Sequence, residues 1–180
     1  MGRVILLLAL FGLLSACAPI SEDACRAGNW RGIGISDGTN GLPASTVGKY
    51  AETCAEFGIA PDLTAYQAGR AEGLKTYCTP DNAYQEGRQG DALRSVCPAA
   101  IAPQMQAAHR HGKRYHDITE DMDRIRERID NREQILDTNF SGTLTPAQQI
   151  EAASIRAEIR SLDNDLFRLR IKRRQYETWP

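Results

Sequence analysis

The sequence predicts an all-α protein, in which a disulfide-stapled domain of short helices is followed by a long antiparallel, coiled-coil-like helical hairpin. Three observations predict this fold class. Glycines and aromatic residues between residues 30 and 97 recur at spacings of three and four, which is the period of a helix. Four cysteines lie in or beside the same region, and two later segments repeat apolar residues at the same spacing.

Residues 1–16 have the pattern of a lipoprotein signal peptide rather than of a folded element. Arg3 gives a positive start, an apolar run follows, and the run ends in Leu14-Ser15-Ala16-Cys17. That ending resembles the lipobox of bacterial lipoproteins, in which the cysteine is acylated on its thiol and its amine. We therefore predict lipidation of Cys17 and a lipidated tether over residues 17–24. The alternative is ordinary secretion, with Cys17 in a disulfide.

A lipid anchor places the expected protein in the bacterial cell envelope. Ala18, not aspartate, follows the cysteine, and by resemblance to sorted lipoproteins this favours the outer membrane, facing the periplasm. The inner membrane stays open as an alternative. Acyl chains such as palmitate on one cysteine would anchor the chain stably, because stable attachment needs at least two signals. The charge is nearly balanced, with 22 Lys+Arg against 23 Asp+Glu, which argues against nucleic acid as a partner.

The predicted cysteine-containing helical domain spans residues 25–103. Its four cysteines are an even number, which in an oxidising compartment indicates two disulfides among Cys25, Cys54, Cys78 and Cys97. Three connectivities are open. We favour Cys25–Cys54 and Cys78–Cys97 because each would staple one helical hairpin, stabilising it by roughly 3 kcal/mol. A zinc site is the alternative, although no two cysteines have the close spacing of a zinc motif.

Local signals divide this domain into short helices. Over residues 29–41, hairpin-turn signals compete with a stripe that steps by four, four and three through Trp30, Gly34, Gly38 and Gly41. We expect a helix there, because the stripe would lie on one helical face. Further helices are expected over residues 45–57 and from Pro61 to the break at Thr79-Pro80. Another is expected in the segment after that break, which ends at Cys97-Pro98.

One motif is written twice and supplies the candidate binding residues. The first copy is Tyr66-x-x-Gly69-Arg70, the second is Tyr84-x-x-Gly87-Arg88, and His109-x-x-Gly112-Lys113 is a fainter echo. The tyrosine rings suit stacking on a sugar or a peptide, and the guanidinium groups of Arg70 and Arg88 suit a carboxylate. The alternative is structural, with the tyrosines packed against glycine grooves and the arginines cross-linking turns.

The order of these residues resembles a family of bacterial envelope proteins, the domain-of-unknown-function family numbered 2799 (DUF 2799). The resemblance covers about Cys25 to Lys113 and includes the four paired cysteines and both tyrosine motifs. The first helix departs from it, because Arg31 and Ile33 stand where more aromatic or apolar residues are expected. Since members of the family are mostly proteobacterial lipoproteins, the resemblance implies an envelope location. It carries no activity and transfers no catalytic residue.

The segment 104–180 is predicted to form the long hairpin. Its two arms carry apolar seams with heptad-like spacing, at Ile118, Met122, Ile125, Ile129, Arg132 and Leu136, and at Ala152, Ile155, Ile159, Leu162, Leu166 and Leu169. Thr145-Pro146 is a helix start, which makes the preceding glycine-containing segment the connecting loop. The arm ends in a cationic stretch over 168–174, suited either to an anionic lipid or peptidoglycan or to a solvated helix end.

No enzyme signature is present, so we expect no catalytic residue, no cofactor and no metal. His109, His111 and His116 lack the spacing of a helical metal pair, and we interpret them as solvated histidines at the start of a helix. Nucleophile motifs and phosphate-binding loops are also missing from the sequence.

The function expected from the sequence is that of a non-enzymatic scaffolding lipoprotein at the outer membrane. The hairpin would be its interaction surface, for an envelope protein partner or for self-association, since a two-helix seam normally gains a third helix. The alternative is a periplasmic module that binds a small ligand or a cell-wall fragment through Tyr66, Arg70, Tyr84 and Arg88. A third hypothesis is an envelope hydrolase, which is disfavoured because the sequence has no recognisable pair of acid and base residues.

Overall fold

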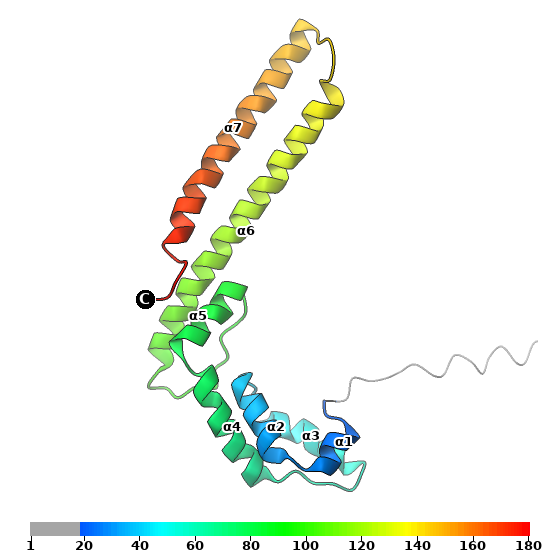
Figure 1. Ribbon diagram of the computed structural model, residues 1–180, viewed down its shortest axis with the longest axis vertical. Coiled ribbons are helices and arrows are strands. Elements are labelled where there is room, and N and C mark those ends of the chain that lie inside the picture. The colour runs from blue at the N-terminus through cyan, green and yellow to red at the C-terminus, as the bar shows by residue number, and fades with distance from the viewer. Residues whose placement is uncertain (1–18) are drawn as a thin grey trace, which may run out of the picture. The chain divides into compact units, whose positions relative to one another are not determined.

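The structure, a computed structural model, describes residues 19–180, which form seven helices and no strand (Figure 1). This confirms the all-α fold class. The predicted signal peptide and Cys17 lie outside the described residues. The chain divides into two compact units, one that ends at Tyr77 and one that spans Cys78–Pro180.

The first unit contains four helices, namely α1 (Glu22–Ala27), α2 (Trp30–Thr39), α3 (Thr46–Ala55) and α4 (Leu63–Tyr77). The helix expected over residues 29–41 is therefore present as α2, and the Asn29 side chain caps it by accepting from the Gly32 amide. Residues 20–24 of the predicted tether belong to the folded unit, because Ile20 is buried and α1 begins at Glu22. Ile20, Trp30 and Tyr66 belong to one apolar core with the Cys25–Cys54 pair.

Helices α2 and α4 pack with their backbones in contact, because glycines face each other along both. A Cβ atom on Gly34 would lie 2.1 Å from the Tyr66 carbonyl oxygen, and one on Gly69 would lie 2.0 Å from the Arg31 carbonyl oxygen. Gly38 repeats the contact against Arg70 one turn later. Since the contacts advance in the same direction on both helices, α2 and α4 run parallel. The repeated glycines therefore set the packing of the first unit.

The second unit contains α5 (Pro80–Gln89), α6 (Ala102–Asn139) and α7 (Pro146–Arg174). Helix α5 packs on the first turns of α6 by the same device, because a Cβ on Gly87 would lie 2.2 Å from the His109 carbonyl oxygen. We expected one domain to end at residue 103, but the two units meet at Tyr77 and Cys78. The physical reason is that α5 lies against α6, so the second half of the cysteine region belongs with the hairpin.

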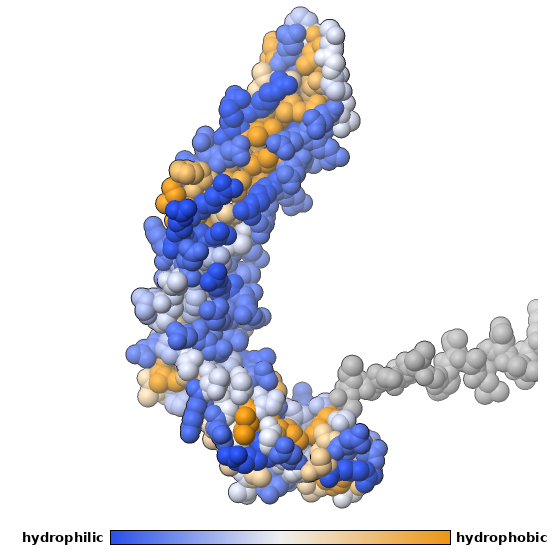
Figure 2. All heavy atoms as spheres, in the orientation of Figure 1, coloured by the Kyte–Doolittle hydropathy of each residue, from blue (hydrophilic) through white to orange (hydrophobic). Residues whose placement is uncertain are grey.

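The hairpin of α6 and α7 has the predicted apolar seam. Ile118, Met122 and Ile129 are buried against Leu162 and Leu166, and the seam appears in Figure 2 as a hydrophobic band bordered by hydrophilic side chains. The start of α7 is fixed by a capping box, in which Thr145 and Gln148 exchange hydrogen bonds between side chain and backbone. Arg132, which takes a seam position, pairs with Glu158 at 2.9 Å.

Both predicted disulfides are present. Cys25 and Cys54 join with their Cα atoms 5.6 Å apart, and Cys78 and Cys97 join with theirs 5.5 Å apart. Each bond lies within one unit, so each unit has its own covalent staple. The zinc alternative is excluded for these cysteines, because all four are disulfide-bonded.

Candidate functional site

The first tyrosine motif builds a buried hydrogen-bond cluster around Asp37 on α2. The Tyr66 hydroxyl donates to Asp37 Oδ2 at 2.7 Å, and the Tyr50 hydroxyl donates to Asp37 Oδ1 at 3.1 Å. Asp37 is only 5% exposed and Tyr66 is fully buried. A buried carboxylate is stable only where its oxygens are bound, and the two phenols supply those bonds. Asp37 therefore links α2, α3 and α4 through their side chains.

The cluster changes the acidity of both phenols. Burial, reinforced by the negative charge of Asp37 and the hydrogen bond to it, raises the pKa of Tyr50 to about 12. Burial and the hydrogen bond to Asp37 likewise raise the pKa of Tyr66 above its usual value. The two hydroxyls accordingly stay protonated as donors across the physiological pH range.

Arg70 of the first motif is also bound to the protein itself. Its Nε and Nη2 atoms donate to the Leu42 carbonyl oxygen at 2.9 and 2.7 Å. Leu42 follows Gly41, whose φ of +64° turns the chain at the end of α2. Arg70 thus fastens the turn after α2 to α4, while the ligand-binding role expected for Tyr66 and Arg70 stays a prediction.

The second tyrosine motif binds the C-terminal segment of the chain. The Tyr84 hydroxyl lies 2.9 Å from the Tyr176 carbonyl oxygen and 2.5 Å from that of Glu177, and Arg88 Nη1 donates to the Glu177 carbonyl at 3.1 Å. Figure 1 shows this segment returning from α7 toward α5 and α6. We call Tyr84, Arg88 and His111 the tail cradle, because they hold the backbone of residues 176–178.

His111 completes the tail cradle on the α6 side. Its Nε2 lies 3.0 Å from the Thr178 carbonyl oxygen, so this nitrogen carries the proton in that contact. Its ring packs against Tyr84, Tyr176 and Trp179, with centroid distances of 5.9, 5.0 and 5.5 Å. The interpretation of His111 as a solvated histidine is therefore wrong. The only sequence signal for this contact is the pair of aromatic residues near the C-terminus.

Tyr115 adds a cation-binding ring beside the tail cradle. The Arg88 guanidinium lies 4.0 Å from the centre of the Tyr115 ring, and that of Arg173 lies 5.1 Å from it. These contacts connect α5, α6 and the end of α7. Sequence analysis did not single out Tyr115, because its role depends on residues far along the chain.

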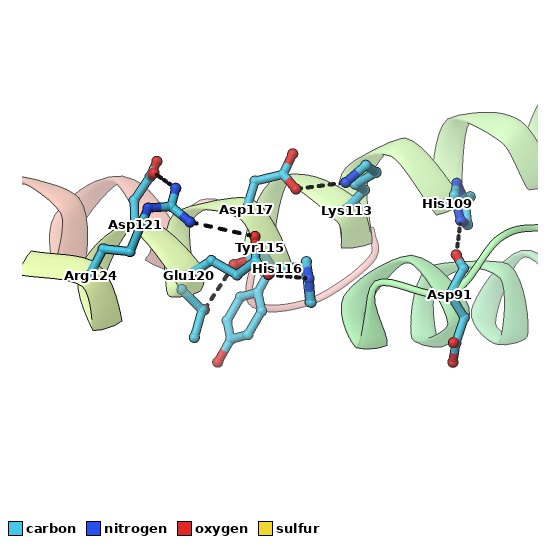
Figure 3. Close-up of polar contacts among 10 residues, drawn as sticks. Asp91, His109, Lys113, Tyr115, His116, Asp117, Glu120, Asp121 and Arg124 are labelled. Atoms are coloured by element: carbon cyan, nitrogen blue, oxygen red, sulfur yellow. Dashed lines mark hydrogen bonds and ion pairs between the residues drawn. The ribbon is translucent and has the colours of Figure 1, made fainter. Parts of the chain in front are cut away.

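The other two histidines make the polar contacts drawn in Figure 3, His109 with the segment that follows α5 and His116 within α6. His109 Nε2 lies 2.7 Å from the Asp91 carbonyl oxygen, and His116 Nε2 lies 3.4 Å from a Glu120 carboxylate oxygen. Within residues 19–180, no group of three or more His, Cys, Asp or Glu side chains is arranged to hold a metal ion. No described helix has the length and apolar character needed to span a membrane.

A cavity of about 410 Å³ lies between the segment that follows α5 and the first turns of α6. Its lining is apolar at Leu93, Cys97 and Met105 and cationic at Arg94 and Arg110. A volume of this size is within the range of small-molecule sites. None of the four residues of the tyrosine motifs lines it. Sequence reasoning missed this site, since no motif marks it.

Comparison with known proteins gives a family but no activity. No curated protein and no solved structure is significantly similar to this chain. Residues 29–114 match the model of a family described as a protein of unknown function, DUF2799. The matched region includes α2 to α5, both tyrosine motifs, three of the paired cysteines and the start of α6. Over residues 29–114, the chain is therefore similar to the DUF2799 family.

Proposed function

We propose that this protein is a non-enzymatic scaffold of the bacterial cell envelope, anchored by lipid at Cys17 and bound to a protein partner through α7. The observation that carries the proposal is an apolar stripe on the outward face of α7. Ile150, Phe167 and Ile171 are 74%, 61% and 49% exposed, although they are large apolar side chains. Phe167 and Ile171 lie one helical turn apart, and Ile150 lies nearer the start of α7 on the same side, away from the buried seam residues Leu162 and Leu166.

The two arms of the hairpin differ in the side chains that they expose on the face away from the seam. On α6 the side facing away from the seam carries Asp123, Glu127 and Asp130, all of them exposed. Such a face is suited to solvent, whereas the α7 stripe leaves apolar area exposed to water. A partner helix is therefore expected on α7 and not on α6.

The charges around the stripe indicate the chemistry of the partner. Arg168, Arg170, Lys172 and Arg174 surround Phe167 and Ile171 at the end of α7. Of these cations, only Arg168 has an ion-pair partner within residues 19–180, namely Asp165. A partner helix with an apolar stripe flanked by aspartate or glutamate would match both features.

The anchor rests on the sequence Leu14-Ser15-Ala16-Cys17. Residue 20 already belongs to the apolar core, so only a short segment separates Cys17 from the first unit. Cell fractionation tests this part, since Cys17→Ser should release the protein from the membrane and remove the mass of the acyl chains. A Cys17→Ser protein that stays membrane-bound with unchanged mass would exclude the lipid anchor.

Photo-crosslinking in intact cells tests the partner surface. A photoreactive amino acid at Phe167 or Ile171 should give a discrete adduct with one protein, which mass spectrometry identifies. The same probe at Glu127, on the polar side of α6, is the matched control and should give none. Adducts of equal yield from positions 127 and 167 would contradict a docking surface on α7.

The ligand-binding alternative makes a different prediction. Probes at Tyr66 and Tyr84 would then be the ones that form adducts, in particular with cell-wall fragments. We rank this alternative second, because the polar atoms of both tyrosines are already bound to Asp37 and to the C-terminal segment.

A further inference from the structure

The walls of the cavity between residues 92–97 and the start of α6 are held together by a disulfide, a hydrogen bond and apolar packing. Its loop side is tied by the Cys78–Cys97 disulfide to the residue just before the N-cap of α5. At the other end of the loop, His109 Nε2 contacts the Asp91 carbonyl at 2.7 Å. Leu93 and Cys97 also pack against the buried cluster that contains Met105. A site held at both ends of its loop is preformed, so binding would need little ordering of the chain.

The lining of the cavity combines an apolar floor with positive charge at its edge. Ala92, Leu93, Cys97, Ala102 and Met105 supply the apolar surface. Arg94, His109 and Arg110 also line it, while no aspartate or glutamate does. The local charge is therefore positive, although the whole chain has a net charge of −1.

Arg110 is the residue best placed to receive a ligand. It is exposed, lines the cavity, and forms no hydrogen bond or ion pair within residues 19–180. His109, by contrast, already has a ring nitrogen engaged with Asp91. A guanidinium group with free donors recognises carboxylates by paired hydrogen bonds.

We infer that this cavity binds a small amphipathic carboxylate, with the acid on Arg110 and the apolar body against Leu93 and Met105. Two sources share this chemistry, namely a fatty acid and a peptide that ends in apolar residues with a free carboxylate. The proposal goes beyond the scaffold function and is independent of it, because the α7 stripe shares no residue with the cavity.

Isothermal titration calorimetry and amide NMR on the chain from residue 18 onward test the proposal. The probes are decanoate, the blocked peptide N-acetyl-leucyl-leucine with a free carboxylate, and decyltrimethylammonium as a chain of the opposite charge. We expect saturable binding of at least one carboxylate probe, with amide shifts centred on residues 92–110. The tighter of the two carboxylates identifies the source of the ligand, and the ammonium probe should not bind there.

Two exposed arginines on α6 give a matched pair of variants. Arg110→Gln should weaken binding of the carboxylate at least tenfold. Arg114→Gln removes the same charge one turn later, from a residue outside the cavity, and should change the affinity less than twofold. Both side chains are exposed, so both variants should keep the fold. The proposal is overturned if neither carboxylate binds, if the ammonium probe binds equally well, or if the two variants behave alike.

Discussion

The backbone of Gly34 lies directly against that of Tyr66, so that a Cβ atom on Gly34 would stand 2.1 Å from the Tyr66 carbonyl oxygen. Gly112 has the same relation, at the same 2.1 Å, to Tyr84 in the second unit. Each copy of the tyrosine motif is thus one side of a parallel helix pair whose other side supplies a glycine. The repeat in the sequence is a repeat of helix packing, and the tyrosine hydroxyls extend from it to different partners.

The glycine contacts predict a sharp difference between two alanine substitutions. Gly34→Ala should lower the free energy of unfolding of the first unit by at least about 1–3 kcal/mol, because the new methyl group overlaps backbone atoms of α4. Gly48→Ala in α3 is the matched control, since nothing lies within 4 Å of a Cβ there, and it should stabilise the unit by about 0.5–1 kcal/mol. Denaturant unfolding followed by the fluorescence of the buried Trp30, in a Trp179→Phe background, measures both. Equal effects would contradict the close packing.

Asp37 should be one of the most sensitive positions in the first unit. Asp37→Ala leaves the buried hydroxyls of Tyr50 and Tyr66 without an acceptor, at about 1–3 kcal/mol each. The same unfolding measurement should therefore show a loss of roughly 2–6 kcal/mol. Glu52→Ala, at an exposed residue of α3, should stay within about 0.5 kcal/mol of the parent. A loss at Asp37 no larger than that at Glu52 would show that the cluster does not hold the unit together.

The raised phenol pKa values predict a loss of stability at high pH. In the unfolded chain Tyr50 ionises with a pKa of 10.0, whereas in the fold its pKa is raised to about 12. Folding therefore favours the protonated phenol, and the stabilisation is complete below pH 10 and is lost as the pH rises towards 12. Denaturant unfolding of the first unit at a series of pH values should show this decline. Replacing both phenols, as Tyr50→Phe with Tyr66→Phe, should remove most of the decline, and an unchanged slope in that variant would assign it to other groups.

The tail cradle predicts release of the C-terminal segment when one hydroxyl is removed. Tyr84→Phe deletes the donor to the carbonyl groups of Tyr176 and Glu177, a loss of about 0.5–1.5 kcal/mol. In a Trp30→Phe background, Trp179 emission should shift to the red and become easier to quench. Tyr66→Phe deletes a hydroxyl in the other unit and should leave Trp179 emission unchanged. Identical spectra for the parent and Tyr84→Phe would mean that the ring contacts of His111 hold the segment without the hydroxyl.

Periodicity predicted the helices well, because the helical positions of glycine have a packing reason. Gly38 lies in an apparent hairpin-turn signal, yet it is inside α2, where a Cβ would come within 2.3 Å of the Arg70 carbonyl oxygen. The turn signal three residues later was correct, since Gly41 ends the segment with a φ of +64°. Helical spacing placed Gly38 correctly but also included Gly41, which lies outside α2, so neither spacing nor local turn propensity alone separated the two glycines.

The sequence could not predict which distant residues the side chains bind by hydrogen bonds. Tyr84 binds the backbone of Tyr176, 92 residues later, and backbone carbonyls leave no mark in a sequence pattern. No sequence motif marks Asp37 as the acceptor for two tyrosines, and only the three-helix arrangement brings Tyr50 and Tyr66 to it. The unit boundary at Tyr77 was missed for the same reason, because it depends on which helix α5 packs against.

The central claim is that a partner covers the outward face of α7 in the cell. Hydroxyl-radical footprinting tests it directly on the unaltered protein, by comparing oxidation in intact cells with oxidation after purification. Leu63 is the internal reference, because it is 51% exposed and lies in the other unit. We predict that oxidation of Phe167 and Ile171, relative to Leu63, is several-fold lower in cells than in the purified protein. A ratio that is the same in both samples would contradict the claim.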